Sequence, residues 1–376
     1  MDVAFNAMKM KYIEMDETIG KLIKNNRIQT CNLFINLDWI NFRFRNVDSN
    51  NRFQACGAAS FKQYASNVLN LVAHYKKWFL RNGRVHVKCY IYYTNAVGGF
   101  TSSLINRDYR SKFISTQDIN NPDCYYVNRT IVGALELLTK ICDYIDGVYL
   151  INSKGEEPSV VPYLISQELP ADWNFILTKD RLELQYVNYD RFSIIYPSPT
   201  RGNRLINASD LWPIIGEKEH KTTPHINEYD PKLFIPVMAI AGNIDRSVRK
   251  IKAIGWCSIL DMLDEIWSTS KDHSIVTLLD KLTELLVSTN KKVQEKYMYT
   301  FRMNMLLFSM KSRYEVMSNT NKTMILAQIK DIPDRETINE ISTNPVFFGN
   351  YPINVEALFN KSIGTVDWGK PGKGLI

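Results

Sequence analysis

The sequence predicts an α/β protein with a mostly parallel central sheet, helices on both faces of the sheet, and an all-helical C-terminal region. Short runs rich in Val, Ile, Tyr and Phe recur through the first 200 residues. Segments with apolar residues at helical spacing lie between these runs. Strands that alternate with helices in this way form parallel sheets. From about residue 240, only the helical spacing continues.

The strands are predicted from short apolar runs that end at polar or turn-forming residues. After a short amphipathic helix and a polar link in residues 1–30, the predicted strands are residues 33–37, 85–93, 148–151, 173–177 and 192–196.

The helices are predicted from apolar residues that recur every three or four positions. Residues 60–80 and 129–145 show this pattern, and Gly83 and Gly147 end it. Pro158 suits the first turn of a further helix. The C-terminal helices are expected at residues 259–267, 275–287 and 293–317, before a tail from residue 332.

Composition excludes few classes of function. The 376 residues are 45% hydrophobic and 23% charged, as in ordinary globular proteins. Lys and Arg outnumber Asp and Glu by 46 to 39, which gives a formal charge of +7 and permits a polyanionic partner. The six cysteines form no CxxC pair, so reduced core thiols in a cytoplasmic protein are expected. No apolar run approaches ~18 residues, so no transmembrane helix is predicted.

Carboxylates follow three of the predicted strands directly. They are Asp38, the pair Glu156 and Glu157, and Asp180. If the strands are parallel neighbours, these groups converge on one edge of the sheet, where α/β proteins place their chemistry. Converging carboxylates repel one another and favour hard divalent cations, which can activate water against a phosphodiester. For Asp38 alone, a helix cap remains an alternative.

Residues 240–255 combine a Gly-containing turn, a further acid and a basic cluster. Asp245 lies in the turn, and the cluster contains Arg246, Arg249, Lys250 and Lys252. A hairpin between two helices can present backbone N–H groups and basic side chains to phosphates. A helix–turn–helix with a solvated basic face is the alternative.

Three stretches of the chain resemble the superfamily of flap endonucleases and phage 5′ nucleases. Residues 35–45 resemble its opening strand, with the first metal-binding Asp and a following Arg. Residues 177–187 resemble its S-x-D-x-D-x-x-Q-L-V stretch, with Asp180 and Gln185 in register. Residues 241–255 resemble the entry to its helix–three-turn–helix. Residues 155–158 and 109–112 match more weakly.

The resemblance implies a PIN-like nuclease domain over residues 1–238, a helical DNA-binding region with the helix–three-turn–helix over 239–330, and a tail over 331–376. It implies metal binding by Asp38, Glu156 or Glu157, Asp180 and Asp245, with Mg²⁺ or Mn²⁺ at one site rather than two. Arg110 and Lys112 would meet the scissile phosphate. The implied DNA-binding residues are Arg43, Arg45, Arg246, Arg249, Lys250, Lys252 and Gly255.

Several acids of the family pattern are replaced in this chain. The second strand ends at Tyr93, Thr94 and Asn95 rather than at Asp, and Leu182 and Asn243 stand where further acids are usual. The sequence leaves open whether Asp108 or Glu183 supplies a missing carboxylate.

The sequence therefore predicts a Mg²⁺-dependent 5′ nuclease of the 5′–3′ exonuclease, flap endonuclease or RNase H type. Its expected substrates are branched or 5′-ended duplex DNA or an RNA–DNA hybrid, at primers or flaps in phage-type replication or repair. We expect a cytoplasmic monomer that works beside replication proteins and has no membrane partner. One alternative is a degenerate pseudo-nuclease that binds nucleic acid or a protein without cutting. The other is an unrelated α/β scaffold with coincidental acids.

Overall fold

The structure, a computed structural model, describes residues 17–37, 46–47, 53–54, 61–94, 133–143, 145–198, 202–243, 248, 250–251, 254–286 and 291–330.

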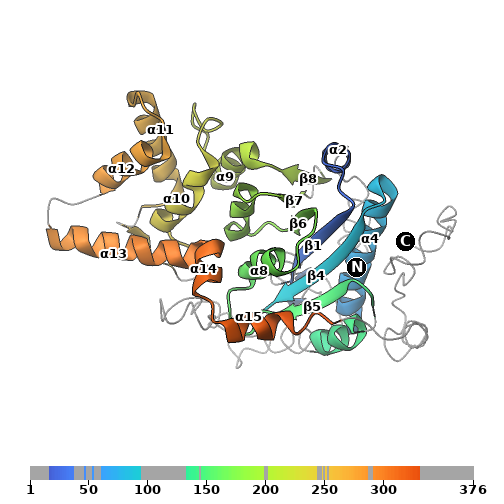
Figure 1. The fold of residues 1–376 in the computed structure, drawn as a ribbon. Coiled ribbons are helices and arrows are strands. Elements are labelled where there is room, and N and C mark those ends of the chain that lie inside the picture. Colours follow the sequence, from blue (N-terminus) through green and yellow to red (C-terminus); the bar gives the residue numbers. More distant parts are fainter. Residues whose placement is uncertain are drawn as a thin grey trace.

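A six-stranded sheet in the order β5-β4-β1-β6-β7-β8 forms the centre of the described structure (Figure 1). The first five of these strands are parallel, and β8 pairs antiparallel with β7. Their carboxyl ends therefore lie at the same edge of the sheet. The bounds are β1 Thr30–Asn36, β4 His86–Tyr93, β5 Val148–Asn152, β6 Trp173–Leu177, β7 Phe192–Ser198 and β8 Gly202–Ile206.

All five strands expected from the sequence are confirmed, and β8 is an addition. This edge strand carries Asn203 and Arg204 in its five residues, so it lacks the continuous apolar run of a central strand. A separate two-stranded sheet pairs β2 (Asn46–Val47) with β3 (Phe53–Gln54).

One face of the sheet is covered by α2 (Glu17–Asn25), α4 (Phe61–Gly83) and the helical residues 133–142. Because side chains alternate along a strand, Leu33 and Ile35 of β1 point to this face and pack against α4. Phe34 points to the opposite face. The helix expected at 60–80 is confirmed and continues to Gly83.

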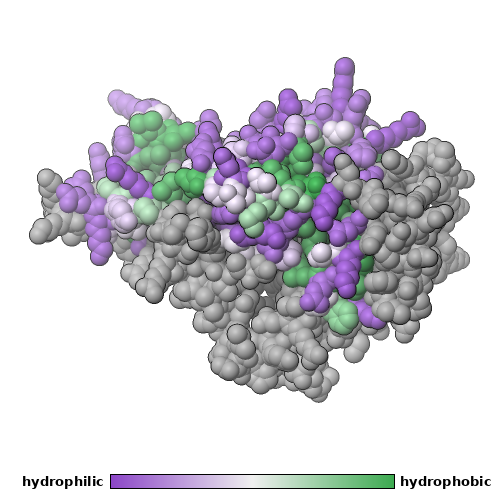
Figure 2. Space-filling model, turned by 60° about the horizontal axis from the view of Figure 1, so that its bottom comes forward, coloured by the Kyte–Doolittle hydropathy of each residue, from purple (hydrophilic) through white to green (hydrophobic). Residues whose placement is uncertain are grey.

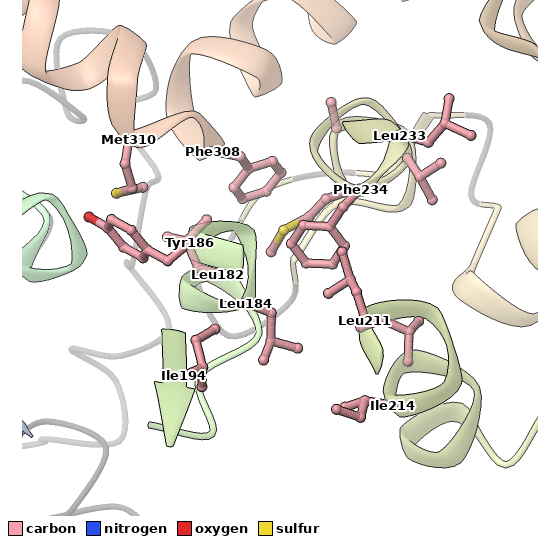
Figure 3. Close-up of a cluster of buried hydrophobic side chains, with 14 of the residues drawn as sticks. Leu182, Leu184, Tyr186, Ile194, Leu211, Ile214, Leu233, Phe234, Phe308 and Met310 are labelled. Atoms are coloured by element: carbon pink, nitrogen blue, oxygen red, sulfur yellow. The ribbon is translucent and has the colours of Figure 1, made fainter. Parts of the chain in front are cut away.

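The other face is joined to the helical region by one continuous core. Among its members are residues of η3 (Leu182–Asn188), β7, α9 (Leu211–Glu219), α10 (Phe234–Ala241), α13 (Lys291–Phe308) and α14 (Met310–Val316). Figure 3 shows Leu184 and Tyr186 of η3 in this cluster, with Phe234 and Phe308 from the helical region. The helical region is thus packed on the sheet rather than linked loosely to it. The helix α10 crosses residue 238, and the division into domains stays a prediction.

The remaining helices are α8 (Val161–Glu168), preceded by the 3₁₀ turn η2 (Pro158–Val160), and α11 (Trp256–Thr269), α12 (Ile275–Leu286) and α15 (Asn319–Leu326). The helix start at Pro158 is confirmed. The single helix expected at 293–317 is wrong, because the structure has two helices there, α13 and α14, with Ser309 between them. Its Oγ accepts the N–H of Ser312 at 3.2 Å and begins α14.

Among the described residues, no helix is both long and apolar enough to cross a membrane. In the view of Figure 2, the surface of the described residues is largely hydrophilic, with smaller hydrophobic groups between.

Cys31, Cys89 and Cys142 are free and buried, as expected. Cys257 is exposed near the start of α11, which corrects the expectation that every thiol lies in the core.

Candidate functional site

The described residues include five of the predicted site residues: Glu156, Glu157, Asp180, Lys250 and Gly255. The others lie outside the described part of the chain, and they are Asp38, Arg43, Arg45, Arg110, Lys112, Asp245, Arg246, Arg249 and Lys252.

Asp180 lies on a fixed turn immediately after β6. Its N–H donates to Thr178 Oγ1 at 2.9 Å, and its Oδ1 accepts the N–H of Leu182 at 2.9 Å. This side-chain-to-backbone turn starts η3 and leaves the carboxylate half-buried at the carboxyl edge of the sheet. Leu182, which stands where the family pattern has a second acid, is fully buried in the core.

Glu183 brings a carboxylate to this edge that the family pattern does not include. Its side chain is fully buried. Oε1 accepts hydrogen bonds from Asn36 Nδ2 at 2.7 Å and from Tyr92 OH at 2.6 Å. Asn36 and Tyr92 are at the carboxyl ends of β1 and β4. Glu183 is therefore buried next to the part of the sheet edge that these two strands form.

The second oxygen of Glu183, Oε2, is buried and accepts no hydrogen bond from the described residues. Burial and the nearby Asp180 charge raise the pKa of the Glu183 carboxyl above its ordinary value. The hydroxyls of Thr178, Tyr92 and Ser159 act in the opposite direction, because they stabilise the charged form. A desolvated carboxylate beside a second acid is a usual mark of a functional site.

Glu157 lies near the Glu183 carboxylate, on the side of the sheet edge where β5 ends. It occupies the N-cap position of the 3₁₀ turn η2 without a side-chain capping bond, and it is 1% exposed. Ser159 lies between the two glutamates: its hydroxyl is 3.5 Å from Glu157 Oε1 and also interacts with Glu183. The structure therefore places Glu157, Asp180 and Glu183 near the same edge of the sheet, while the metal-binding role expected for Glu157 and Asp180 stays a prediction.

Glu156 is held by the C-terminal helix α15. Its Oε1 accepts a hydrogen bond from Asn321 Nδ2 at 2.7 Å, and its side chain is 2% exposed. A second attachment is made by Gln328, whose side-chain amide pairs with the N–H and C=O of Asn152 at 2.9 and 2.8 Å. Because β5 is an edge strand, Gln328 pairs with backbone groups at its carboxyl end.

A hairpin precedes α11, where the sequence predicted an element that grips DNA. Gly242 has φ 67° and ψ −173°, a conformation that is essentially restricted to glycine. Asn243 and Val248 then exchange backbone hydrogen bonds of 3.0 and 2.8 Å. Gly255 is the N-cap residue of α11 and has no side chain to cap it, so the first N–H groups of α11 have no side-chain cap there. Lys250 Nζ lies close to Gly255, 3.4 Å from where a Cβ would be.

We call the carboxyl edge of the sheet with Glu157, Asp180 and Glu183 the acidic edge. Arg181 links this edge to the start of α11. Its guanidinium carbon lies 4.9 Å from the ring centroid of Trp256, the first residue of α11. It also forms an ion pair with Glu219 of α9. Arg181 follows Asp180 and Trp256 follows Gly255, so the two predicted functional segments contact each other through neighbouring residues.

The possible metal ligands at the acidic edge are all carboxylate oxygens, which suit Mg²⁺ or Mn²⁺ better than soft metals. Within the described ranges, no three His, Cys, Asp or Glu side chains are placed to hold a metal ion. Asp38 and Asp245 are outside those ranges. The buried, unpaired Oε2 of Glu183 is the described atom that a cation would satisfy.

No protein-family model matches the chain, and none of the curated proteins matches it. The solved structures that are similar in fold include the following two. A flap endonuclease of bacteriophage T5, in a pseudo-enzyme–product complex with DNA and metal ions, has a TM-score of 0.53 and 14% identity and covers 79% of this chain and 98% of its own. The T5 protein co-crystallised with metal ions has a TM-score of 0.50 and 14% identity and covers 80% of this chain and 100% of its own. The chain therefore has a flap-endonuclease-like fold.

Proposed function

We propose that the chain is a divalent-metal-dependent 5′ nuclease that hydrolyses phosphodiesters at branched or 5′-ended duplexes. The observation that carries this proposal is the meeting of Glu157, Asp180 and Glu183 at the carboxyl edge of a parallel sheet. The likeness to structures that contain DNA and metal ions is in fold alone, but it agrees with this chemistry.

The acidic edge would hold Mg²⁺ or Mn²⁺ through Asp180 and Glu183, with Asp38, Glu157 and Asp245 as further ligands. When bound, a cation there supplies Lewis acidity that activates a water and stabilises the leaving oxygen. The residues of the chain fix the donors: Thr178 and Leu182 orient Asp180, while Asn36 and Tyr92 hold one oxygen of Glu183. Glu156 is the less available acid, since Asn321 already binds it.

The substrate would be bound by three groups of basic residues. The start of α11, with Gly255 and Lys250, offers N–H groups and a cation to the duplex backbone, and Arg246, Arg249 and Lys252 would extend this contact. Arg110 and Lys112 would meet the scissile phosphate, with Arg43 and Arg45 beside the first acid. Removal of primers or flaps in phage-type replication is the corresponding role.

The test is cleavage of a labelled 5′-flap duplex with Mg²⁺ and with Mn²⁺. We expect cleavage by the wild type, loss in Asp38→Ala/Asp180→Ala, and a loss of at least about 100-fold in Asp180→Ala alone. Asp190→Ala is the matched control. Asp190 is exposed and precedes the amino end of β7, whereas the acidic edge lies at the carboxyl ends of the strands. Equal activity in Asp180→Ala and Asp190→Ala would contradict the proposed site.

Glu183→Gln tests the added carboxylate without activity as the readout. Glutamine can still accept the hydrogen bonds from Asn36 and Tyr92, but it carries no charge. We expect Mn²⁺ to bind the wild type and to bind this variant about 10-fold or more weakly by calorimetry. Unchanged Mn²⁺ affinity would exclude Glu183 as a ligand.

A pseudo-nuclease that binds nucleic acid without cutting is the second candidate. It is favoured by the buried Leu182 and by the bond that engages Glu156. No cleavage with either metal, together with salt-sensitive binding of the same flap, would support it.

A further inference from the structure

Four basic side chains gather around two aromatic rings beside Asp180. Lys179 Nζ, Arg204 Cζ and Lys218 Nζ lie 5.0, 5.4 and 5.6 Å from the ring centroid of Tyr196. They come from three elements: the turn after β6, strand β8 and helix α9. The fourth, Arg181, stacks on Trp256. We call Lys179, Arg204, Lys218 and Tyr196 the Tyr196 cluster.

Two of the carboxylates near this cluster pair with arginines. Glu217 binds Arg204 at 3.2 Å, and Glu219 binds Arg181. The lysines lie close together, because Lys218 Nζ donates to the backbone oxygen of Lys179 at 2.8 Å. Burial and the nearby Arg181 guanidinium lower the pKa of Lys218 to about 8. A cation–π contact attracts one such cation to the ring, but several cations on one ring repel each other. An added anion beside the ring would offset this repulsion.

The place of the cluster identifies the anion. Lys179 directly precedes Asp180, so the cluster borders the acidic edge on the side of β7 and β8. Arg181 and Trp256 lie between Asp180 and the N-terminus of α11. A nucleic-acid strand that runs from the acids toward α11 would bring its phosphates past these side chains. Lysine binds phosphate as a compact charge and does not require the geometry of a paired fork.

We propose that Lys179 and Lys218, arranged around Tyr196, bind a phosphodiester of the nucleic-acid strand next to the one that is cut. This inference rests on the proposed function, since it names a contact of the same substrate. It adds a basic site on the β7 side of the acids, separate from the hairpin before α11.

The experiment measures binding of a 5′-flap duplex in EDTA, where cleavage cannot interfere, at several KCl concentrations. For Lys179→Gln/Lys218→Gln, we expect the slope of log affinity against log salt to fall by about one, since the two lysines share one phosphate and each neutralised phosphate contributes about 0.9. The matched control is Lys21→Gln/Lys24→Gln, which removes the same charge from exposed positions of α2. The control should keep the wild-type slope.

A second variant protects the test against misfolding, because Lys218 is largely buried. Lys179→Gln alone changes a half-buried residue, and its slope should fall by less than that of the double variant but clearly below the wild-type slope. In addition, methylphosphonates that remove the charge of single linkages beside the cut should weaken binding by the wild type. They should weaken binding by the Lys179→Gln variant less.

The outcomes separate the two proposals. If the wild type binds the flap and both lysine variants keep its affinity and slope, the phosphate site is wrong while the proposed function stands. If the wild type binds no flap in EDTA and cuts none with either metal, both proposals are wrong. A slope lost equally in the α2 control would also overturn the site, because net charge alone would then explain the effect.

Discussion

Arg181 stacks on Trp256 with its guanidinium carbon 4.9 Å from the ring centroid, and this contact joins the acidic edge to the first turn of α11. Arg181 is also paired with Glu219, so its position is fixed from both sides. A loss of the contact would loosen the alignment between the proposed metal site and the proposed duplex clamp.

The first prediction is that the two residues stabilise the fold jointly. A double-mutant cycle with Arg181→Gln and Trp256→Leu should give a coupling free energy of about 1 kcal/mol, because the cation–π contact is partly desolvated. Urea unfolding of the four proteins measures it. Changes in the free energy of unfolding that add without coupling would show that the stacking contributes nothing. Glu219→Gln in place of Trp256→Leu reports the ion pair separately.

The hydrogen bonds of Gln185 form a second connection between the sheet and the helical region. Its Nε2 donates to the backbone oxygens of Leu182 and Phe308 at 2.7 and 2.8 Å, and its Oε1 accepts the N–H of Met310 at 3.0 Å. The family pattern includes this glutamine, and in this chain its amide connects η3 to the junction of α13 and α14.

We therefore expect Gln185→Leu to lower the free energy of unfolding by about 3 kcal/mol, since it leaves buried backbone groups unpaired. Chemical denaturation measures the loss. Gln167→Leu, at an exposed position of α8, should change stability by no more than about 0.5 kcal/mol. A similar small change in both variants would mean that the Gln185 bonds do not support the docking of the helices.

The sequence predicts the central strands well because parallel strands covered on both faces are continuous apolar runs. The edge strand β8 and the break at Ser309 are missed for physical reasons. The first is short and partly polar, and the second interrupts a helix whose apolar spacing continues across the break. Local pattern carries no information on these features.

For the candidate site, the sequence places Asp180 and the two adjacent glutamates at strand ends, because each directly follows an apolar run. The sequence alone left Glu183 as one of two open alternatives. Its hydrogen-bond donors Asn36 and Tyr92 are 147 and 91 residues away in the chain, so only the fold brings them together. The only local signal is a charged residue within the apolar stretch 182–187. The contact of Arg181 with Trp256 is equally inaccessible to local pattern.

The third prediction concerns pH and the buried Lys76. This side chain is 1% exposed, its amine donates to the backbone oxygen of Asp146 at 3.0 Å, and burial lowers its pKa from 10.5 to about 8. Between those values the unfolded chain binds more protons than the folded one. Stability from this residue should therefore rise with pH between about 8 and 10.5, by up to about 3 kcal/mol.

Comparison with Lys76→Met isolates this contribution, because the other groups titrate in both proteins. The free energy of unfolding of the wild type should rise relative to that of Lys76→Met as pH increases through this range. Lys88→Met, at an exposed position of β4, should follow the wild type. A constant difference between wild type and Lys76→Met would show that the amine is not desolvated.

The fourth prediction tests whether α15 is fixed to the acidic edge through Glu156. Asn321 donates to Glu156 Oε1 at 2.7 Å, so Asn321→Asp would replace a donor with a second carboxylate facing a buried one. We expect Asn321→Asp to lower the free energy of unfolding by about 1 to 2 kcal/mol more than Asn321→Ala does, because like charges at this distance repel. Urea unfolding near neutral pH measures both.

Asn319→Asp is the control, since it makes the same chemical change at an exposed position in the first turn of the same helix. A carboxylate there is favoured by the helix dipole, so this variant should be no less stable than the wild type. If Asn321→Asp and Asn321→Ala were equally stable, Glu156 would not face this position as a charged group.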